Sequence, residues 1–344
     1  MRVLASPIIA QGNPYIGLLY SALAERGVVV EQFSLNTIKQ PCDICHVHWP
    51  DLILSEKSIF ASFNQVFRFF AMLVWCKLRW RSKVLWTVHN LEPHDRTLPN
   101  WWRRLFYRIW IGLVDGCIFM SEASRHEFEF KYQRSFSHSI IPHGHYCDLY
   151  EKIVPEKGLK ERLGIEPLDV VFGHYGQIRD YKNVPHLMRE FSKLTSDRYK
   201  LIIAGKVHSK DGRLLREIES LAAADDRIHF IPGFVSDPMI KGLYKLTHWA
   251  VLPYKDILNS GSAILALSLS CPVLVPNFPT MLELRSQIGT DLIRLISETG
   301  LSRALHECSS HSSKGCEREH LKELEWPALS SCTHDFYTKI LRKK

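Results

Sequence analysis

The 344-residue sequence alternates short apolar runs with longer amphipathic segments along most of its length, and this alternation constrains the fold more than any other feature. Runs such as VVVEQFS and KVLWTVH have the length of strands, while residues 15–26 and 55–78 have the apolar spacing of helices. Strands that alternate with helices form parallel βαβ units. The sequence therefore predicts an α/β protein built on parallel sheets.

The alternation weakens once, through a polar stretch with proline and glycine over residues 149–168, and then restarts. A chain of this length suits two domains of about 150 residues each. We expect an N-terminal Rossmann-like domain over 1–148, a linker over 149–168, and a second domain over 169–325. A final helix over 326–344 is expected to pack back toward the first domain. Ligands of such sheets bind at the carboxyl ends of strands, which places a site in a cleft between the domains.

Two loops in the second half follow a predicted strand and open a predicted helix. In the first, GHYGQIRDYKN, Gly176 allows close backbone approach to a ligand, and Arg179 and Lys182 supply positive charge. The second offers side-chain caps and backbone amides at a helix start. Its residues are Asn259, Ser260, Gly261 and Ser262. Helix N-termini with free amides bind phosphate, so the pair predicts a diphosphate site, although each loop alone is also consistent with an ordinary capped turn.

Two further segments of this half extend the predicted nucleotide site. Lys206 ends the strand LIIAGK and is a candidate contact to a phosphate or to the nucleotide. The loop that follows IHFIP is the candidate site for the nucleotide base. Its residues are Phe234, Val235 and Ser236.

Four short motifs, LWTVHNLEPH, IIPHG, GQIRDYKN and LIIAGK, occur in an order that resembles the GT-B glycosyltransferases, in particular the large retaining group 1 enzymes. The resemblance extends over about residues 1–280. It implies two Rossmann-like domains that face each other across a cleft. It also implies transfer of a sugar from a nucleotide-sugar donor that the C-terminal domain binds.

The chain departs from that group where the group has two glutamates eight positions apart. Alignment on Cys271-Pro272-Val273 places Ile257 and Leu265 at those positions. The small-residue loop instead resembles the inverting β-mannosyltransferases of bacterial exopolysaccharide synthesis, such as the xanthan pathway. That resemblance implies inversion, GDP-mannose as donor, a lipid-linked saccharide acceptor and no metal cofactor. The alternatives are another GT-B nucleotide-sugar enzyme, such as an epimerase, and a degenerate sugar-binding subunit without activity.

Inversion requires a general base for the acceptor hydroxyl, and Asp, Glu or His serves best. The segment HWPD offers His48 and Asp51, while HNLEPHD offers His89, Glu92, His94 and Asp95. We select Glu92 and Asp95 as candidate bases, because they lie on the loop after a predicted strand. His89 ends that strand, and the resemblance implies that it contacts the donor sugar. The alternative is that the carboxylates are solvated loop residues.

Positive charge is concentrated between Phe60 and Leu113. This stretch has nine Lys or Arg residues and two acidic residues, so it carries +7 of the net charge of +8. The same stretch holds thirteen aromatic residues, and WWRRLFYRIWIGL predicts a helix with an aromatic and a basic face. Such helices bind anionic lipid surfaces, although helix packing on a sheet explains the same pattern. No nucleic-acid-binding motif accompanies the charge, so a nucleic-acid partner is not expected.

Nine cysteines are too few for a disulfide scaffold in a chain of this length, and most lie in apolar runs. This usage, together with the absence of a signal-peptide pattern or a long apolar stretch, predicts a cytoplasmic protein, peripheral at the inner face of the membrane. The spacing of Cys42, Cys45 and His48 is consistent with a set of metal ligands. However, strand alternation separates Cys45 from His46 and no second ligand pair follows, so no metal is predicted.

Overall fold

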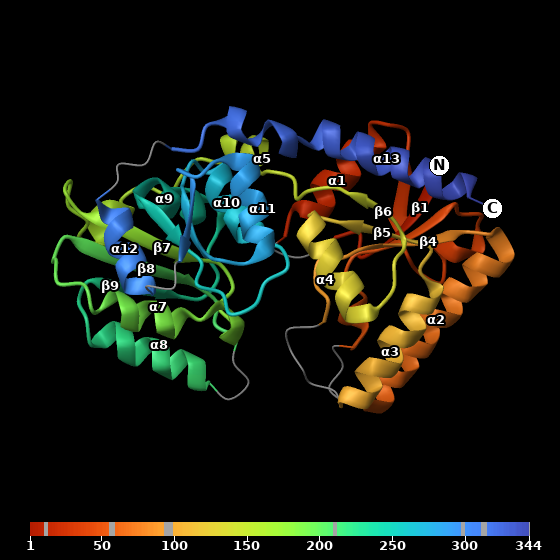
Figure 1. Ribbon diagram of the computed structural model, residues 1–344, viewed down its shortest axis with the longest axis horizontal. Coiled ribbons are helices and arrows are strands. Elements are labelled where there is room, and N and C mark those ends of the chain that lie inside the picture. The colour runs from red at the N-terminus through yellow and green to blue at the C-terminus, as the bar shows by residue number, and fades with distance from the viewer. Residues whose placement is uncertain are drawn as a thin grey trace. The chain divides into compact units, whose positions relative to one another are not determined.

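The computed structural model divides the chain into two compact units (Figure 1). Unit 1 comprises residues 1–144 together with 324–344, and unit 2 comprises residues 145–323. The structure describes residues 1–9, 13–54, 59–92, 99–208, 212–296, 300–310 and 315–343, with the side chains of 59–61 left aside.

Unit 1 contains a six-stranded, fully parallel sheet in the order β2-β1-β3-β4-β5-β6. Its strands are β1 (Arg2–Ser6), β2 (Val29–Gln32), β3 (Ile44–Val47), β4 (Lys83–Thr87), β5 (Gly116–Phe119) and β6 (Ser137–Ile140). Its helices are α1 (Tyr15–Ala24), α2 (Ile59–Trp80), α3 (Asn100–Leu113), α4 (Glu122–Tyr132) and α13 (Trp326–Arg342), with short 3₁₀ turns η1 (Thr37–Lys39) and η2 (Pro50–Leu54).

The two faces of this sheet are covered by different helices, because successive side chains of a strand point to opposite faces. Ile44 and Leu85 pack with α1 and α13 in one buried cluster. Trp86, one residue further along β4, packs instead on aromatic residues of α3 and α4. Helix α13 lies along α1, so the C-terminal segment completes the core of unit 1. Gly144 leaves room for this contact, since a Cβ atom there would lie 2.5 Å from the Trp326 ring.

Unit 2 contains a second six-stranded parallel sheet in the order β12-β11-β10-β7-β8-β9. Its strands are β7 (Val170–Tyr175), β8 (Tyr199–Gly205), β9 (Ile228–Pro232), β10 (Trp249–Val251), β11 (Val273–Pro276) and β12 (Ile293–Ile296). Its helices are α5 (Cys147–Glu151), α6 (Leu159–Arg162), α7 (Val184–Phe191), α8 (Arg213–Ala223), α9 (Asp237–Leu246), α10 (Gly261–Ser268), α11 (Pro279–Ile288) and α12 (Leu301–Ser309), with turns η3 (Asp180–Lys182) and η4 (Arg318–Leu324).

The core of unit 2 contains buried side chains of β7, β8 and β10 packed against α7, α8 and α12. The predicted α/β class with parallel sheets is confirmed by both units. Residues 149–168, which the sequence suggested as a linker, hold α6 and belong to unit 2. Within the described ranges, no helix combines the length and the apolar character needed to cross a membrane.

Candidate functional site

Four adjacent strands of unit 2 end at the same edge of the sheet, and the predicted donor residues lie on the loops that follow them. The strands are neighbours in the order β10-β7-β8-β9, and all are parallel. Their carboxyl ends therefore place residues 252–260, 176–183, 206–208 and 233–236 along one edge. This is the edge at which open parallel sheets bind ligands.

The two phosphate-type loops are joined directly to each other. The backbone N–H of Lys255 donates to the Tyr181 carbonyl oxygen at 2.9 Å, and the rings of Tyr181 and Tyr254 lie 5.9 Å apart. These contacts hold η3 of the first loop against the segment that leads into α10. The structure thus brings Lys182 close to the second loop, as a single diphosphate site requires.

Lys182 is a buried cation at this edge, with only 6% of its surface exposed. Its Nζ lies 5.5 Å from the Tyr254 ring centre, and among the described residues it has no carboxylate within ion-pair distance. Burial, with a smaller contribution from Arg179, lowers the pKa of Lys182 to about 8. Because burying an ammonium group is costly without an anionic partner, the side chain is suited to a ligand that brings negative charge.

Two more polar groups lie buried beside Lys182. Nε2 of His174 has no hydrogen-bond partner in the described part of the chain, while the Tyr254 hydroxyl lies near the Ser260 and Ser262 hydroxyls, and the His174 and Tyr254 rings are 6.1 Å apart. His174 Nδ1 is 2.8 Å from the Val251 carbonyl oxygen, so it carries the ring proton and leaves Nε2 as an acceptor. Buried polar atoms are normally satisfied, and here a bound ligand or water would satisfy them.

Helix α10 begins beside this cluster. Ser260 is buried at the N-cap and its hydroxyl accepts from the Ala263 N–H at 3.1 Å, while Gly261 and Ser262 form the first turn. The remaining amides of that turn and the helix dipole favour an anion. Asn259, directly before the cap, is half-buried. The predicted small-residue loop therefore lies at a true helix start.

The other predicted donor residues lie at the same edge but are more exposed. Arg179 is half-buried, with Nη2 3.3 Å from Gln177 Oε1, and Lys206 is exposed after β8. Phe234 is 85% exposed, and Ser236 caps α9. Val235 lies half-buried between them. The predicted roles of these residues in binding the donor stay predictions.

The first loop can approach β8 only because residue 205 is glycine. A Cβ atom on Gly205 would lie 1.7 Å from the Gly176 carbonyl oxygen. Gly176 itself has a φ of +103°, in the region that favours glycine. The two glycines thus fix the path of the loop that carries Lys182.

We expect Gly205→Ala to lower the free energy of unfolding by about 1–3 kcal/mol, because overpacking forces the Gly176 backbone to move. Gly17→Ala is the matched control: a Cβ atom there meets no neighbour within 4 Å in α1, and alanine favours the helix. Urea unfolding of both variants checks this. Equal stability of Gly205→Ala and the wild type would contradict the close approach.

At the corresponding edge of unit 1, histidines follow two neighbouring strands. His48 follows β3 and His89 follows β4, and their Nδ1 and Nε2 atoms lie 3.1 Å apart. Trp49 stacks on His89 with ring centres 4.3 Å apart, and Tyr15 meets the same ring edge-on at 5.1 Å. These rings form a largely buried cluster, in which Tyr15, His48 and His89 are each at most 8% exposed. Burial lowers the pKa of His89 well below its ordinary value, which keeps the ring neutral.

The candidate bases differ in their surroundings. Glu92 is 2.8 Å from Lys131 Nζ and 3.9 Å from Arg103 Nη1, two ion pairs that stabilise its charged form. Asp95 lies outside the described residues. Asp51, in η2, has no cation within ion-pair distance in the described ranges, and desolvation raises its pKa to about 6. The sequence offered Asp51 without selecting it, and the half-buried carboxyl group is distinguished by the desolvation that raises its pKa.

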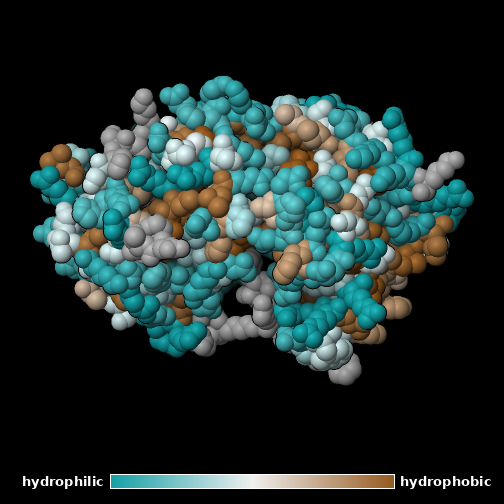
Figure 2. Space-filling view, in the orientation of Figure 1, coloured by the Kyte–Doolittle hydropathy of each residue, from teal (hydrophilic) through white to brown (hydrophobic). Residues whose placement is uncertain are grey.

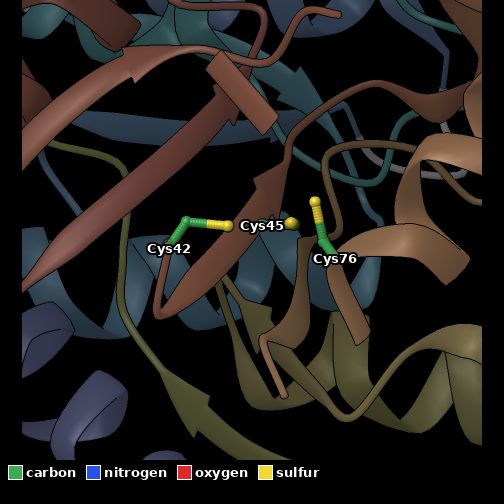
Figure 3. Close-up of side chains that lie close together, drawn as sticks. All are labelled: Cys42, Cys45 and Cys76. Carbon is green, nitrogen blue, oxygen red and sulfur yellow. The ribbon is translucent and has the colours of Figure 1, made fainter. Parts of the chain in front are cut away.

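Three buried thiols converge at the opposite end of β3 (Figure 3). The sulfur atoms of Cys42, Cys45 and Cys76 lie within 4.8 Å of one another, and the described part of the chain adds no His, Asp or Glu to the group. Structural zinc sites have four protein ligands, whereas small thiols often fill cores. As predicted, the side chains of Cys45 and His46 lie on opposite faces of the sheet, since His46 contacts Tyr20 and Tyr337 on the face away from the thiols. The absence of a metal cofactor stays a prediction.

Comparison with known proteins bears on the fold and the class of enzyme. No protein-family model matches the chain. It is 27% identical over 339 residues to the GDP-mannose:glycolipid 4-beta-D-mannosyltransferase of Xanthomonas campestris pv. campestris, and the match covers 97% of this chain and 90% of that protein.

Solved structures extend the comparison. Sucrose-phosphate synthase from Thermosynechococcus elongatus matches with a TM-score of 0.73 and 14% identity, covering 100% of this chain and 99% of that one. Anabaena HepE in complex with UDP matches with a TM-score of 0.60 and 13% identity, covering 99% and 97%. The structural matches confirm the predicted GT-B fold. With the mannosyltransferase match, they confirm the predicted class of enzyme, a glycosyltransferase.

Proposed function

We propose that the protein transfers mannose from GDP-mannose to a glycolipid-linked saccharide and forms a β-linkage. The observation that carries the proposal is the buried Lys182, which has no carboxylate partner among the described residues and lies on the loop held against the segment that leads into α10. The mannosyltransferase match over nearly the whole chain supports the choice of donor and acceptor. Bacterial exopolysaccharide or glycolipid synthesis is the corresponding biological role.

In this reaction the acceptor oxygen forms a bond to the anomeric carbon while the bond to the donor phosphate breaks. Lys182, Arg179 and the first turn of α10 would neutralise the departing diphosphate, with Lys206 near the nucleotide and the 233–236 loop near the base. These groups act without a metal. Since the sugar of GDP-mannose is α-linked, a β-product requires inversion and a single displacement.

A single displacement needs a base to accept the proton of the acceptor hydroxyl. We propose Asp51 for this role, with Asp95 as the second candidate, because a catalytic base works best with a pKa near the working pH. The pKa of about 6 that desolvation gives Asp51 meets this condition. Glu92, in contrast, is engaged in ion pairs with Lys131 and Arg103.

The test is incubation of the full chain with GDP-mannose and a glycolipid acceptor, followed by NMR of the product. We expect a new mannosyl residue with the β-configuration and stoichiometric release of GDP. An α-linked product would contradict inversion, and conversion of the donor sugar without transfer would identify an epimerase instead. If GDP-mannose, UDP-glucose and related donors neither bind nor react, the protein is a non-catalytic subunit.

We also propose that unit 1 binds an anionic membrane through α2 and α3. These helices pack side by side, and hydrophobic side chains gather over them in the lower right of Figure 2. The exposed apolar members are Phe63, Phe67, Val74, Trp75 and Leu78 on α2 and Trp101, Leu105 and Ile109 on α3. Exposed basic members are Arg68, Arg79, Arg104 and Arg108. Exposed aromatic side chains interleaved with cations suit the headgroup region of anionic lipid.

We expect the protein to float with vesicles of phosphatidylglycerol and phosphatidylethanolamine, and to dissociate as salt is raised, because each surface cation contributes about 1 kcal/mol. The double variant Trp75→Ser/Trp101→Ser should bind at least tenfold more weakly. Phe130→Ser, which removes an exposed aromatic residue of α4, is the control and should float like the wild type. Equal flotation of all three proteins would contradict a membrane role for α2 and α3.

A further inference from the structure

Three cysteine side chains of unit 1 meet at the amino end of β3, away from the carboxyl edge that holds the proposed sugar site. Cys42 precedes β3, Cys45 lies in β3 and Cys76 lies in α2, and their sulfur atoms are within 4.8 Å of one another. In the view of Figure 3, the Cys45 sulfur lies between the other two side chains. The three residues, which we call the thiol cluster, are free thiols and at most 4% exposed.

One residue, Ser82, ties together the backbone segments that carry two of these thiols. Its hydroxyl donates to the Cys42 carbonyl oxygen at 2.7 Å, and its backbone N–H donates to the Cys76 carbonyl oxygen at 3.2 Å. Ser82 Oγ also lies 3.2 Å from Cys42 Sγ, and the residue is only 2% exposed. The segment before β3 and the end of α2 are therefore fixed to each other, which holds the thiols close without a bond between them.

The chain on both sides of Cys42 is fixed as well. The Arg2 guanidinium donates to the carbonyl oxygens of Gln40 at 3.0 Å and Pro41 at 2.8 Å, and the Arg2 backbone N–H donates to Asp43 Oδ2 at 2.7 Å. Pro41 and Asp43 are exposed although Cys42 between them is buried. The thiol cluster thus lies just below the surface, where an ion from solvent can reach it.

The number and kind of donor atoms point to a soft ion that needs few ligands. Thiolate sulfur selects soft metals, among them Cu(I) and zinc. Structural zinc sites take four protein ligands, whereas the thiol cluster has three, with no histidine or carboxylate of the described residues in the group. Around one ion with bonds of about 2.3 Å, three sulfur atoms are about 4 Å apart, so small side-chain shifts would complete the site.

We propose that Cys42, Cys45 and Cys76 bind one Cu(I) ion through three thiolate ligands. Three Cu–S bonds form and the thiol protons pass to solvent, while copper keeps its oxidation state. Arg2, which also pairs with Glu31, brings a positive charge that offsets part of the negative charge of the thiolates. The ion joins β3 to α2 and stabilises unit 1, and it takes no part in sugar transfer. This inference does not rest on the proposed function.

Titration of the reduced full chain with Cu(I), under nitrogen and in competition with a chromogenic Cu(I) chelator, measures affinity and stoichiometry. We expect one tightly bound Cu(I) per chain, with only sulfur neighbours in X-ray absorption. Cys45→Ala and Cys76→Ala should each weaken binding by about 10²-fold or more, since even an outer partner of a metal ligand contributes 10- to 100-fold. Cys117→Ala, which removes a buried thiol of β5, and Cys332→Ser, on α13, are the controls and should bind like the wild type.

A chain that leaves all copper with the chelator would overturn the proposal. So would equal binding by the thiol-cluster variants and the controls, or a nitrogen or oxygen ligand in the absorption spectrum. A measurement on the wild type makes the test independent of the folding of the variants. In moderate urea, bound Cu(I) should slow the reaction of Cys42, Cys45 and Cys76 with N-ethylmaleimide, measured by mass spectrometry, but not that of Cys332. Equal rates for the three thiols with and without copper would contradict the site.

Discussion

Replacing Lys182 with methionine is expected to lower kcat for sugar transfer by about 10²- to 10³-fold, the usual effect of removing a group that stabilises charge developing in the transition state. The buried ammonium group has no carboxylate within ion-pair distance in the described part of the chain, so its charge is available to the leaving diphosphate. Lys193→Gln, which removes an exposed lysine paired with Glu190, is the control and should leave kcat unchanged. Steady-state kinetics with saturating donor measures both.

The protonation of Lys182 adds a pH dependence. Its pKa in the folded chain is lowered from 10.5 to about 8, so the unfolded chain binds more protons between these values. Stability should therefore rise between about pH 8 and 10.5, because the cost of burying the charge disappears as the group becomes neutral. Affinity for GDP should fall over the same range. An affinity that is flat from pH 7 to 10 would contradict a role for the ammonium group in binding the donor.

Replacing Asp51 with asparagine is expected to lower kcat by about 10²- to 10⁴-fold, the contribution typical of a general base. In the wild type, the rate should rise with pH through about 6 as the carboxyl group loses its proton, and the variant should lack this limb. Asp335→Asn, which changes an exposed carboxylate on α13, is the control. A pH–rate profile of the three proteins decides the assignment.

The same substitution should raise stability, which separates a catalytic loss from a folding defect. The pKa of Asp51 is raised from 3.8 to about 6 on folding, so the folded chain binds more protons between these values and loses stability as pH rises through them. Asparagine removes this cost, and we expect a gain of about 1–3 kcal/mol at pH 7 by urea unfolding. A variant with wild-type activity would exclude Asp51 as base and leave Asp95 as the candidate.

The fold could largely be predicted from the sequence, because the inner strands of both sheets are buried apolar runs and many of the helices between them have one apolar face. The final helix α13 begins at the predicted residue 326 and ends at Arg342, two residues before the predicted end. Residues 278–296, which hold α11 and β12, were not assigned to any helix or strand. Strand β12 is an edge strand of four residues in which Arg294 interrupts the apolar pattern. Such a segment has too little periodicity to be recognised.

The functional site could be predicted from the sequence only in part. The two loops of the donor site were predicted because glycine, serine and a lysine at a helix start have a direct physical meaning. The burial of the site residues could not be predicted. Nothing in the local sequence indicates that the Lys182 side chain lies near the Tyr254 ring, or that the Asp51 carboxyl group is desolvated. The thiol cluster joins β3 and α2, which only the tertiary structure brings together.

The most direct test of the central claim, that this chain transfers a sugar from a nucleotide donor, is acceptor-dependent release of nucleotide. The purified full chain is incubated with GDP-mannose, with and without a glycolipid acceptor, and GDP is measured over time. We predict rapid release of GDP only when the acceptor is present, and loss of that release in Lys182→Met but not in Lys193→Gln. No release with any nucleotide-sugar and acceptor, or equal release by wild type and Lys182→Met, would contradict the account.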